Sequence, residues 1–353
     1  MFTATKKRVK HAFKAQCRHT RWFRHAALLA LLPMALMLPR AAPAASDVTI
    51  SIGYQPIVNG PLWIARHEGY FKKRGLDIDW IKFVSGPAQF AALQGNRINI
   101  AWGGVGTFMG VYANGADIRL IAPLEDYNGV EGLIVPKGSP IKTPAQLSGH
   151  TVALTKASDG DFGLQKMMRN NGIDPASVKV LYMDTPQQVA AFLNGNIDAA
   201  FTWPPFLNQL EAHGGRVIYR NSALKAGPGI LGWVAKADWL KKNESVVTRL
   251  LAAWDEGLKT MKAHPELAAK YTNEYTGMTL EAAQKVQHDL RYFDAAGMIT
   301  KGSPVYFAPN SALHEMLTDF AQFGIDRGVM KTRPDPDKYV DLHFVKSYAA
   351  TRK

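Results

Sequence analysis

The sequence predicts an α/β protein of two lobes, each a mainly parallel sheet flanked by helices. Two observations support this prediction. Strand-like and helix-like segments alternate along most of the chain, which favours parallel strands covered by helices. About 308 residues follow an N-terminal leader, more than a single hydrophobic core usually organises.

Short apolar runs bounded by turn residues mark the strands, and apolar residues at helical spacing mark the helices. The first block predicts strands at 48–53, 76–83, 98–102 and 118–122 and helices at 62–71 and 87–94. The second block predicts strands at 132–135, 151–155 and 178–183 and helices at 162–170 and 186–194. After residue 236 the pattern is wholly helical, at 244–262, 265–275, 280–292 and 311–327. We expect this helical tail to pack back on lobe one.

One helix–strand unit occurs twice, and it locates the two lobes. Residues 87–96 (PAQFAALQGN) and 186–196 (PQQVAAFLNGN) start 99 residues apart, and each precedes an apolar strand followed by a tryptophan, Trp102 or Trp203. We expect one copy in each lobe, with the chain crossing near 134–139 and 232–237. Lobe one then comprises 46–136 and 237–353, and lobe two comprises 137–236.

Residues 1–45 have the features of a secretory signal peptide. A cationic stretch without acids precedes an apolar run at 26–38 and a small-residue stretch at 41–45. The apolar run has about 13 residues, fewer than the roughly 20 that span a bilayer. The sequence therefore predicts cleavage near Ala44 and a protein free in the periplasm.

Composition excludes several classes of function. Cleavage near Ala44 would remove nine cations and no acid, lowering the formal net charge from +13 to +4, so the mature chain lacks the basic character of a nucleic-acid binder. The only cysteine, Cys17, lies in the leader, which leaves the mature chain without disulfides, a thiolate nucleophile or a cysteine metal site. No Walker loop, nucleophile elbow or zinc-protease motif is present. We expect no catalytic residue, no metal and no cofactor.

Polar or glycine-rich loops follow successive strands, at the carboxyl ends where open α/β sheets bind ligands. They lie at 54–61, 85–87, 102–107, 126–131, 156–161 and 203–205. Ser85-Gly86 and Ser158 to Asp161 run directly into helices, so free backbone amides and positive dipole ends would face a shared cleft. This arrangement suits a small oxyanion, although Ser85 is equally well explained as a helix cap.

Several motifs are specific when taken together: IGYQ at 52–55, GYF at 69–71, FVSGPAQ at 83–89, LIVPKGSP at 133–140 and GNIDAAFTWPPF at 195–206. With them the chain resembles, over essentially its whole mature length, the aliphatic-sulfonate, taurine and nitrate group of substrate-binding proteins of ABC importers. The resemblance implies a type II periplasmic-binding fold whose lobes close around a ligand. It also implies a permease of the inner membrane as partner, and we expect a monomer.

The resemblance places ligand-binding residues in both lobes. Carried over by position, the pocket comprises Gln55, Ser85, Gly86 and Gln89 from lobe one and Ser158, Asp159 and Trp203 from lobe two. The loops at the strand ends add the candidates Asn59, Gly104, Val105, Tyr127, Glu131, Asp161 and Pro204. Taken singly, Trp102 and Trp203 are more often core residues than walls of a ligand site.

The sequence departs from the family pattern where it bears on ligand choice. Asp159 and Asp161 stand where sulfonate and taurine binders usually have neutral or histidine residues, and Pro204 stands where an acidic or small residue is common. Carboxylates beside an anion site weaken binding unless the ligand also carries a cation. A zwitterion such as an aminoalkyl sulfonate, with its ammonium facing Asp159, Asp161 or Glu131, meets this requirement.

Other functions remain open at this point. Nitrate, a pyrimidine vitamin precursor or an aromatic acid would suit the same class of protein, because several tryptophans and Tyr127 could wall a flatter pocket. An enzyme resembling thiamine-pyrimidine synthases is a distant alternative, since those chains carry a cysteine-rich motif that this one lacks.

Overall fold

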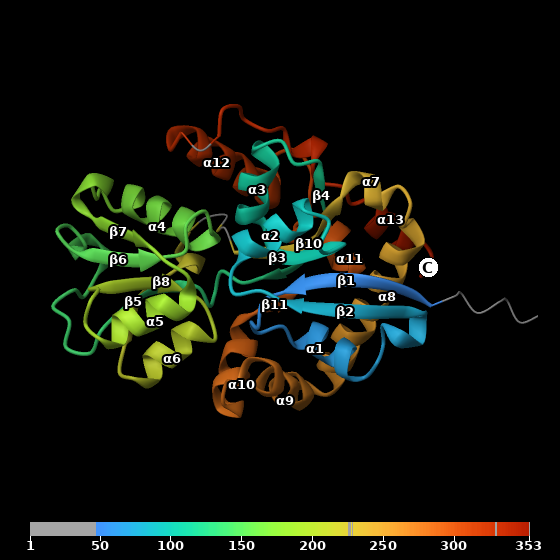
Figure 1. Cartoon of the computed structure of the whole chain (residues 1–353), viewed down its shortest axis with the longest axis horizontal. Helices are drawn as coiled ribbons and strands as arrows, with labels where there is room; N and C mark the ends of the chain where they lie inside the picture. Colours follow the sequence, from blue (N-terminus) through green and yellow to red (C-terminus); the bar gives the residue numbers. More distant parts are fainter. Residues whose placement is uncertain (1–46, 225–226, 228, 329, 353) are drawn as a thin grey trace, which may run out of the picture. The chain divides into compact units, whose positions relative to one another are not determined.

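The computed structural model describes residues 47–352 except 225, 226, 228 and 329. The expected signal peptide and its cleavage site near Ala44 lie outside the described residues. The described part contains two β-sheets and many helices, which confirms the α/β class (Figure 1).

The first sheet has the strand order β11-β4-β10-β3-β1-β2. Its strands are β1 (Val48–Tyr54), β2 (Leu76–Lys82), β3 (Ile100–Gly104), β4 (Ile118–Asp126), β10 (Ile230–Lys236) and β11 (Arg291–Tyr292). β1 pairs in parallel with β2 and β3, whereas β10 runs antiparallel between β3 and β4. β11 is a short strand inside the tail expected to be wholly helical, and it extends the sheet by pairing with β4.

The second sheet has the order β7-β6-β8-β5-β9. Its strands are β5 (Gly132–Val135), β6 (Thr151–Leu154), β7 (Lys179–Tyr182), β8 (Ala199–Thr202) and β9 (Arg216–Arg220). β6 pairs in parallel with β7 and β8, and β5 runs antiparallel to β8 and β9. Apolar clusters cover both faces, as expected for an α/β layer.

The two sheets are mixed, and the chain passes between them earlier than the sequence indicated. β5 and β10 each enter directly from the other sheet, so they lack the crossover helix that a parallel connection needs and run antiparallel to their neighbours. The passages fall between β4 and β5 and between β9 and β10, because the expected crossings at 134–139 and 232–237 start inside β5 and β10.

Helices flank both sheets (Figure 1). They are α1 (Gly60–His67), α2 (Gly86–Gln94), α3 (Val105–Ala113), α4 (Asp159–Asn170), α5 (Thr185–Leu193), α6 (Phe206–Ala212), α7 (Ala237–Leu240), α8 (Glu244–Ala263), α9 (Pro265–Thr276), α10 (Leu280–Asp289), α11 (Ala295–Ile299), α12 (Ala312–Asp326) and α13 (His343–Ala350). The largest buried side chains beside the first sheet include Trp63, Trp102, Trp233 and Trp254, so Trp102 is a core residue.

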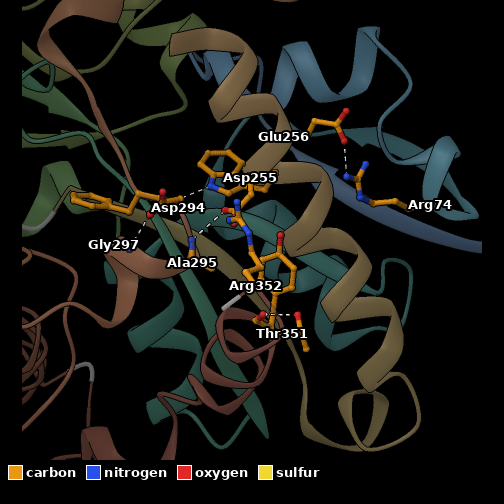
Figure 2. A network of polar contacts seen from close by, with 11 residues as sticks. Arg74, Asp255, Glu256, Asp294, Ala295, Gly297, Thr351 and Arg352 are labelled. Carbon is orange, nitrogen blue, oxygen red and sulfur yellow. Dashed lines mark hydrogen bonds and ion pairs between the residues drawn. The ribbon is translucent and has the colours of Figure 1, made fainter. Parts of the chain in front are cut away.

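The C-terminal tail packs on the first sheet as expected, and polar contacts at α8 fix it there (Figure 2). The buried Asp255 carboxylate of α8 accepts a hydrogen bond from the Ala295 amide at 3.0 Å and pairs with Arg352. Asp294 caps α11 by accepting from the Gly297 amide at 2.7 Å. The last residues of the described chain are therefore held on α8 by a buried acid.

Helix α12 of the tail also contacts the second half of the molecule. The Phe320 ring stacks on Phe162 of α4 with centroids 4.5 Å apart and an interplanar angle of 16°. Lys166 Nζ of α4 lies 2.5 Å from Asp319 Oδ2. The tail therefore does not pack on the first sheet alone, because α12 joins helices that flank both sheets.

Candidate functional site

A small polar cavity lies where strand ends of the two sheets face each other. Its lining residues come from both halves of the chain: Gln55, Ile57, Gly86, Gly104, Thr107, Tyr127, Glu131, Ser158, Asp159, Trp203 and Leu231. The space is about 30 Å³, room for one or two water molecules. In this arrangement the cavity is too small for an organic solute, so its walls must separate to admit one.

The wall from the first sheet is built from the starts of two helices. Gly86 is the first residue of α2, and Gly104 is the residue that precedes α3. Behind them, Gln89 Nε2 donates to the backbone oxygens of Gly53 at 2.6 Å and Trp102 at 2.8 Å. Gln89 therefore ties the carboxyl ends of β1 and β3 together, which fixes where α2 and α3 begin.

The wall from the second sheet is centred on the start of α4. Ser158 caps this helix by accepting from the Asp161 amide at 3.3 Å, and its hydroxyl donates to the Thr155 carbonyl at 2.7 Å. These bonds place Asp159, the first residue of α4, at the cavity. Trp203, 8% exposed, follows β8 and supplies an apolar surface.

A hydrogen bond crosses the cavity between the walls. Asp159 Oδ1 accepts from the Gly106 amide in the first turn of α3 at 2.8 Å. A Cβ atom on Gly104 would lie 1.8 Å from Asp159 Oδ2, so only glycine permits this approach. The carboxylate thus occupies a position that helix amides and the helix dipole favour for an anion.

Two buried carboxyl groups face this space, and the described residues that line it include no lysine or arginine. Burial raises the pKa of Asp159 well above its usual range, the nearby Glu131 raises it further, and the bond from Gly106 opposes the change. Burial likewise raises the pKa of Glu131 to about 7, opposed by Asn221, whose Nδ2 donates to Glu131 Oε2 at 2.8 Å. A cation in the cavity would stabilise the ionised form of both groups.

The structure brings together part of the predicted site. Eight predicted residues line the cavity: Gln55, Gly86, Gly104, Tyr127, Glu131, Ser158, Asp159 and Trp203. The other six are Asn59, Ser85, Gln89, Val105, Asp161 and Pro204, which are buried but not among the lining residues.

Those six residues support the walls through local contacts. Asn59 caps α1 by accepting from the Leu62 amide at 2.9 Å, and Ser85 and Val105 stand at the starts of α2 and α3. Asp161 Oδ2 accepts from the Ala157 amide at 3.1 Å, within its own loop. The Pro204 carbonyl accepts from the Tyr127 hydroxyl at 3.3 Å, joining the two walls at one side.

Sequence reasoning missed three lining residues, Ile57, Thr107 and Leu231. Ile57 and Thr107 lie within the stretches 54–61 and 102–107 that were predicted as loops, but neither was named as a binding residue, and Thr107 stands in the first turn of α3. Leu231 lies in β10, and it reaches the cavity because that strand returns to the first sheet between β3 and β4. No local signal marks such a residue, since its apolar neighbours are typical of any buried strand.

None of the described helices is long and apolar enough to cross a membrane. This concerns residues 47–352 only, with the gaps given above.

Comparisons with known proteins place the chain among solute-binding proteins. It is 25% identical to a putative aliphatic sulfonates-binding protein of Bacillus subtilis (67% of this chain, 72% of the relative) and 25% identical to the taurine-binding periplasmic protein of Escherichia coli (85% and 94%). The alkanesulfonate-binding protein SsuA of Xanthomonas axonopodis pv. citri, solved with MOPS, has a TM-score of 0.73 at 20% identity (84% and 99%).

An enzyme shares the fold as well. The desulfurization enzyme DSZB has a TM-score of 0.66 at 15% identity and covers 86% of this chain and 99% of its own length. The fold alone therefore does not separate a binding protein from an enzyme. The family model described as NMT1/THI5 like matches residues 58–268, more than half of the sequence. The chain belongs to the NMT1/THI5-like family.

Proposed function

We propose that this protein is the periplasmic solute-binding component of an ABC importer and that it binds a small zwitterionic sulfonate between two lobes. One lobe is built on the first sheet and the other on the second, and the chain passes between them after β4 and again before β10. The sulfonate- and taurine-binding relatives support the class of protein. The position of the cavity, between residues of both sheets, supports the mode of binding.

The observation that carries the ligand proposal is the bond from the Gly106 amide to the Asp159 carboxylate. A sulfonate would take the place of this carboxylate at the first turn of α3, where backbone amides and the dipole favour an anion. The displaced Asp159, together with Glu131, would then face an ammonium group of the same ligand. This cation would stabilise the ionised form of both carboxyl groups, which burial otherwise disfavours.

Binding would also drive closure of the two lobes. The 30 Å³ space requires the walls to move apart before a solute enters. A zwitterion that touches α3 with its anion and α4 with its cation binds the closed arrangement better than the open one, and only such a difference shifts the equilibrium. The permease of the inner membrane would then receive the closed, loaded monomer.

We propose binding without chemistry, although DSZB shares the fold. The relatives that match most of the chain are named as binding proteins. The only cysteine, Cys17, lies in the segment expected to be removed, so the mature protein would have no thiol nucleophile. We expect periplasmic localisation after cleavage near Ala44, and no cofactor or metal.

The test is calorimetric titration of the mature protein with taurine, ethanesulfonate, nitrate, a pyrimidine and an aromatic acid. We expect taurine to bind more tightly than ethanesulfonate. Asp159→Asn should weaken taurine binding roughly tenfold to hundredfold, the usual range for a hydrogen bond to a charged group, and should weaken ethanesulfonate binding less. Equal or tighter binding of ethanesulfonate by the unmodified protein contradicts the zwitterion proposal.

Asp161→Asn is the matched control for this experiment. Asp161 is an acid in the same first turn of α4 and is also buried, but it is not among the lining residues of the cavity. We expect its substitution to leave the preference for taurine over ethanesulfonate unchanged. If both variants lose the preference equally, general electrostatics and not the Asp159 position would explain it.

A further inference from the structure

A second, larger space is lined by residues of both halves of the chain. It measures about 590 Å³ and is lined by Pro56, Lys82, Phe83, Val84, Pro186, Pro205, Phe206, Asn208, Gln209, Ala212, Thr276, Gly277, Met278, Thr279 and Ala282. These residues come from the end of β2, from α6 and from the turn between α9 and α10, so both lobes contribute (Figure 1). We call this space the apolar groove.

The groove and the polar cavity are lined by residues that are close in sequence in both walls. In the first wall, Pro56 lies between Gln55 and Ile57, which line the cavity, and Pro56 itself lines the groove. In the second wall, Trp203 lines the cavity and Pro205, two residues later, lines the groove. In both lobes, residues that line the groove thus stand one or two positions from residues that line the cavity.

The two spaces differ in chemistry. The cavity has two buried carboxyl groups and helix amides, whereas Lys82 is the only charged residue among the described residues that line the groove. The groove presents Phe83, Phe206 and Met278, with Val84 53% exposed at its edge. Its volume lies within the roughly 300–1,000 Å³ of small-molecule sites, which are mostly apolar with a few polar groups.

We propose that the apolar groove receives an apolar substituent of the transported solute, whose charged head binds in the polar cavity. This inference rests on the proposed function and narrows it. The ligand class becomes amino sulfonates that carry an alkyl chain or an aromatic ring, and taurine itself is only the head of such a ligand. The substituent contacts residues of both lobes, so it adds to the preference for the closed arrangement.

The experiment is a calorimetric series of N-alkyl taurines of increasing chain length. Burying a methylene group contributes about 0.8 kcal/mol when it leaves water completely, so we expect affinity to rise roughly twofold to fourfold per added methylene. The rise should stop when the groove is filled. Ala212→Trp should flatten the series, because residue 212 is exposed in the groove wall and a large side chain there occupies the space.

A matched pair of variants separates the groove from general surface hydrophobicity. Val84 and Leu280 are each 53% exposed, but only Val84 lines the groove. Val84→Ser should reduce the gain per methylene, while Leu280→Ser should not. Both changes remove an exposed apolar side chain, so neither should prevent folding.

The outcomes distinguish this inference from the proposed function. If taurine binds and the series is flat, the groove does not hold the ligand, although the cavity does. If that flat series accompanies a dimer that Ala212→Trp abolishes, the groove is an interface with a second copy instead. If no member of the series binds, the proposed head-group site and the groove inference both fail.

Discussion

The two sheets carry the same structural unit, and the differences between the copies fall at the cavity. In the first sheet, Asn99 Oδ1 accepts from the Ser51 amide at 2.8 Å, and the Asn99 amide donates to the Ser51 carbonyl at 2.9 Å. In the second sheet, Asp198 Oδ2 accepts from the Thr151 amide at 2.8 Å, and the Asp198 amide donates to the Thr151 carbonyl at 3.1 Å. The same pair of bonds therefore joins the first strand and the third strand of each unit.

This equivalence corrects the alignment of the two tryptophans. Asn99 and Asp198 are 99 residues apart, so Trp102 corresponds to Phe201 and Gly104 corresponds to Trp203. Both Gly104 and Trp203 line the cavity from the same position of their units. One copy offers bare backbone to a charged group, and the other offers an aromatic surface. The duplicated scaffold is thus kept, while the chemistry at its strand ends has diverged.

The largest effect should come from removing the buried carboxyl group of Glu131, which lines the cavity. The pKa of Glu131 is raised to about 7 from 4.5, so the carboxyl contributes stability below about pH 4.5 that is lost as pH rises through 7. Asp159, whose pKa is raised as well, acts in the same direction. We expect Glu131→Gln to be more stable than the unmodified protein at pH 8, by up to about 3 kcal/mol, with the difference disappearing near pH 4.5.

Urea unfolding of both proteins between pH 4.5 and 8 measures this difference directly. Groups that do not interact with Glu131 cancel between the two proteins. Asp159 does not cancel, because Glu131 raises its pKa, and its lower pKa in the variant adds to the difference in the same direction. A difference in stability that does not depend on pH would mean that the pKa of Glu131 is not raised in the folded protein.

A smaller effect should follow from giving Gly104 a side chain, as its counterpart Trp203 has. Gly104→Val places a side chain where the Asp159 carboxylate lies in the closed arrangement. Overpacking of this kind costs about 1–3 kcal/mol, so we expect ligand affinity to fall roughly tenfold to hundredfold. Small-angle scattering should show a more open protein, and Gly110→Ala, in the same helix with open space around it, should change neither quantity. Unchanged affinity in Gly104→Val would show that the walls close without this approach.

The smallest effect should come from the pair of hydrogen bonds that the two units share. Asn99→Ala and Asp198→Ala each remove the side-chain acceptor for one strand amide, which costs about 1 kcal/mol. We expect urea unfolding to show similar losses for both, with ligand preference unchanged because neither residue lines the cavity. A loss confined to one variant would weaken the equivalence of the two units.

Sequence reasoning located much of the cavity because strand ends are recognisable locally. Gly86, Gly104 and Asp159 follow predicted strands, and carboxyl ends of neighbouring strands meet at one edge. The role of Gln89 was less accessible, since a buried amide that ties two strands has the same local pattern as one that binds a ligand. The bond between Asp159 and Gly106 was not foreseen, because it depends on how the two halves face each other.

The position of β10 has a consequence for the order in which the chain can fold. This strand lies between β3 and β4, yet the whole second sheet separates it from them in the sequence. During synthesis, which starts at the N-terminus, all strands of the second sheet come from one continuous segment. The strands β3 and β4 each keep an unpaired edge until β10 has been made. Pairing across such a separation is slow and leaves edges open to association with other chains. The half that contributes Asp159 and Trp203 to the cavity can therefore fold first. The half that contributes Gly104 can complete its sheet only afterwards.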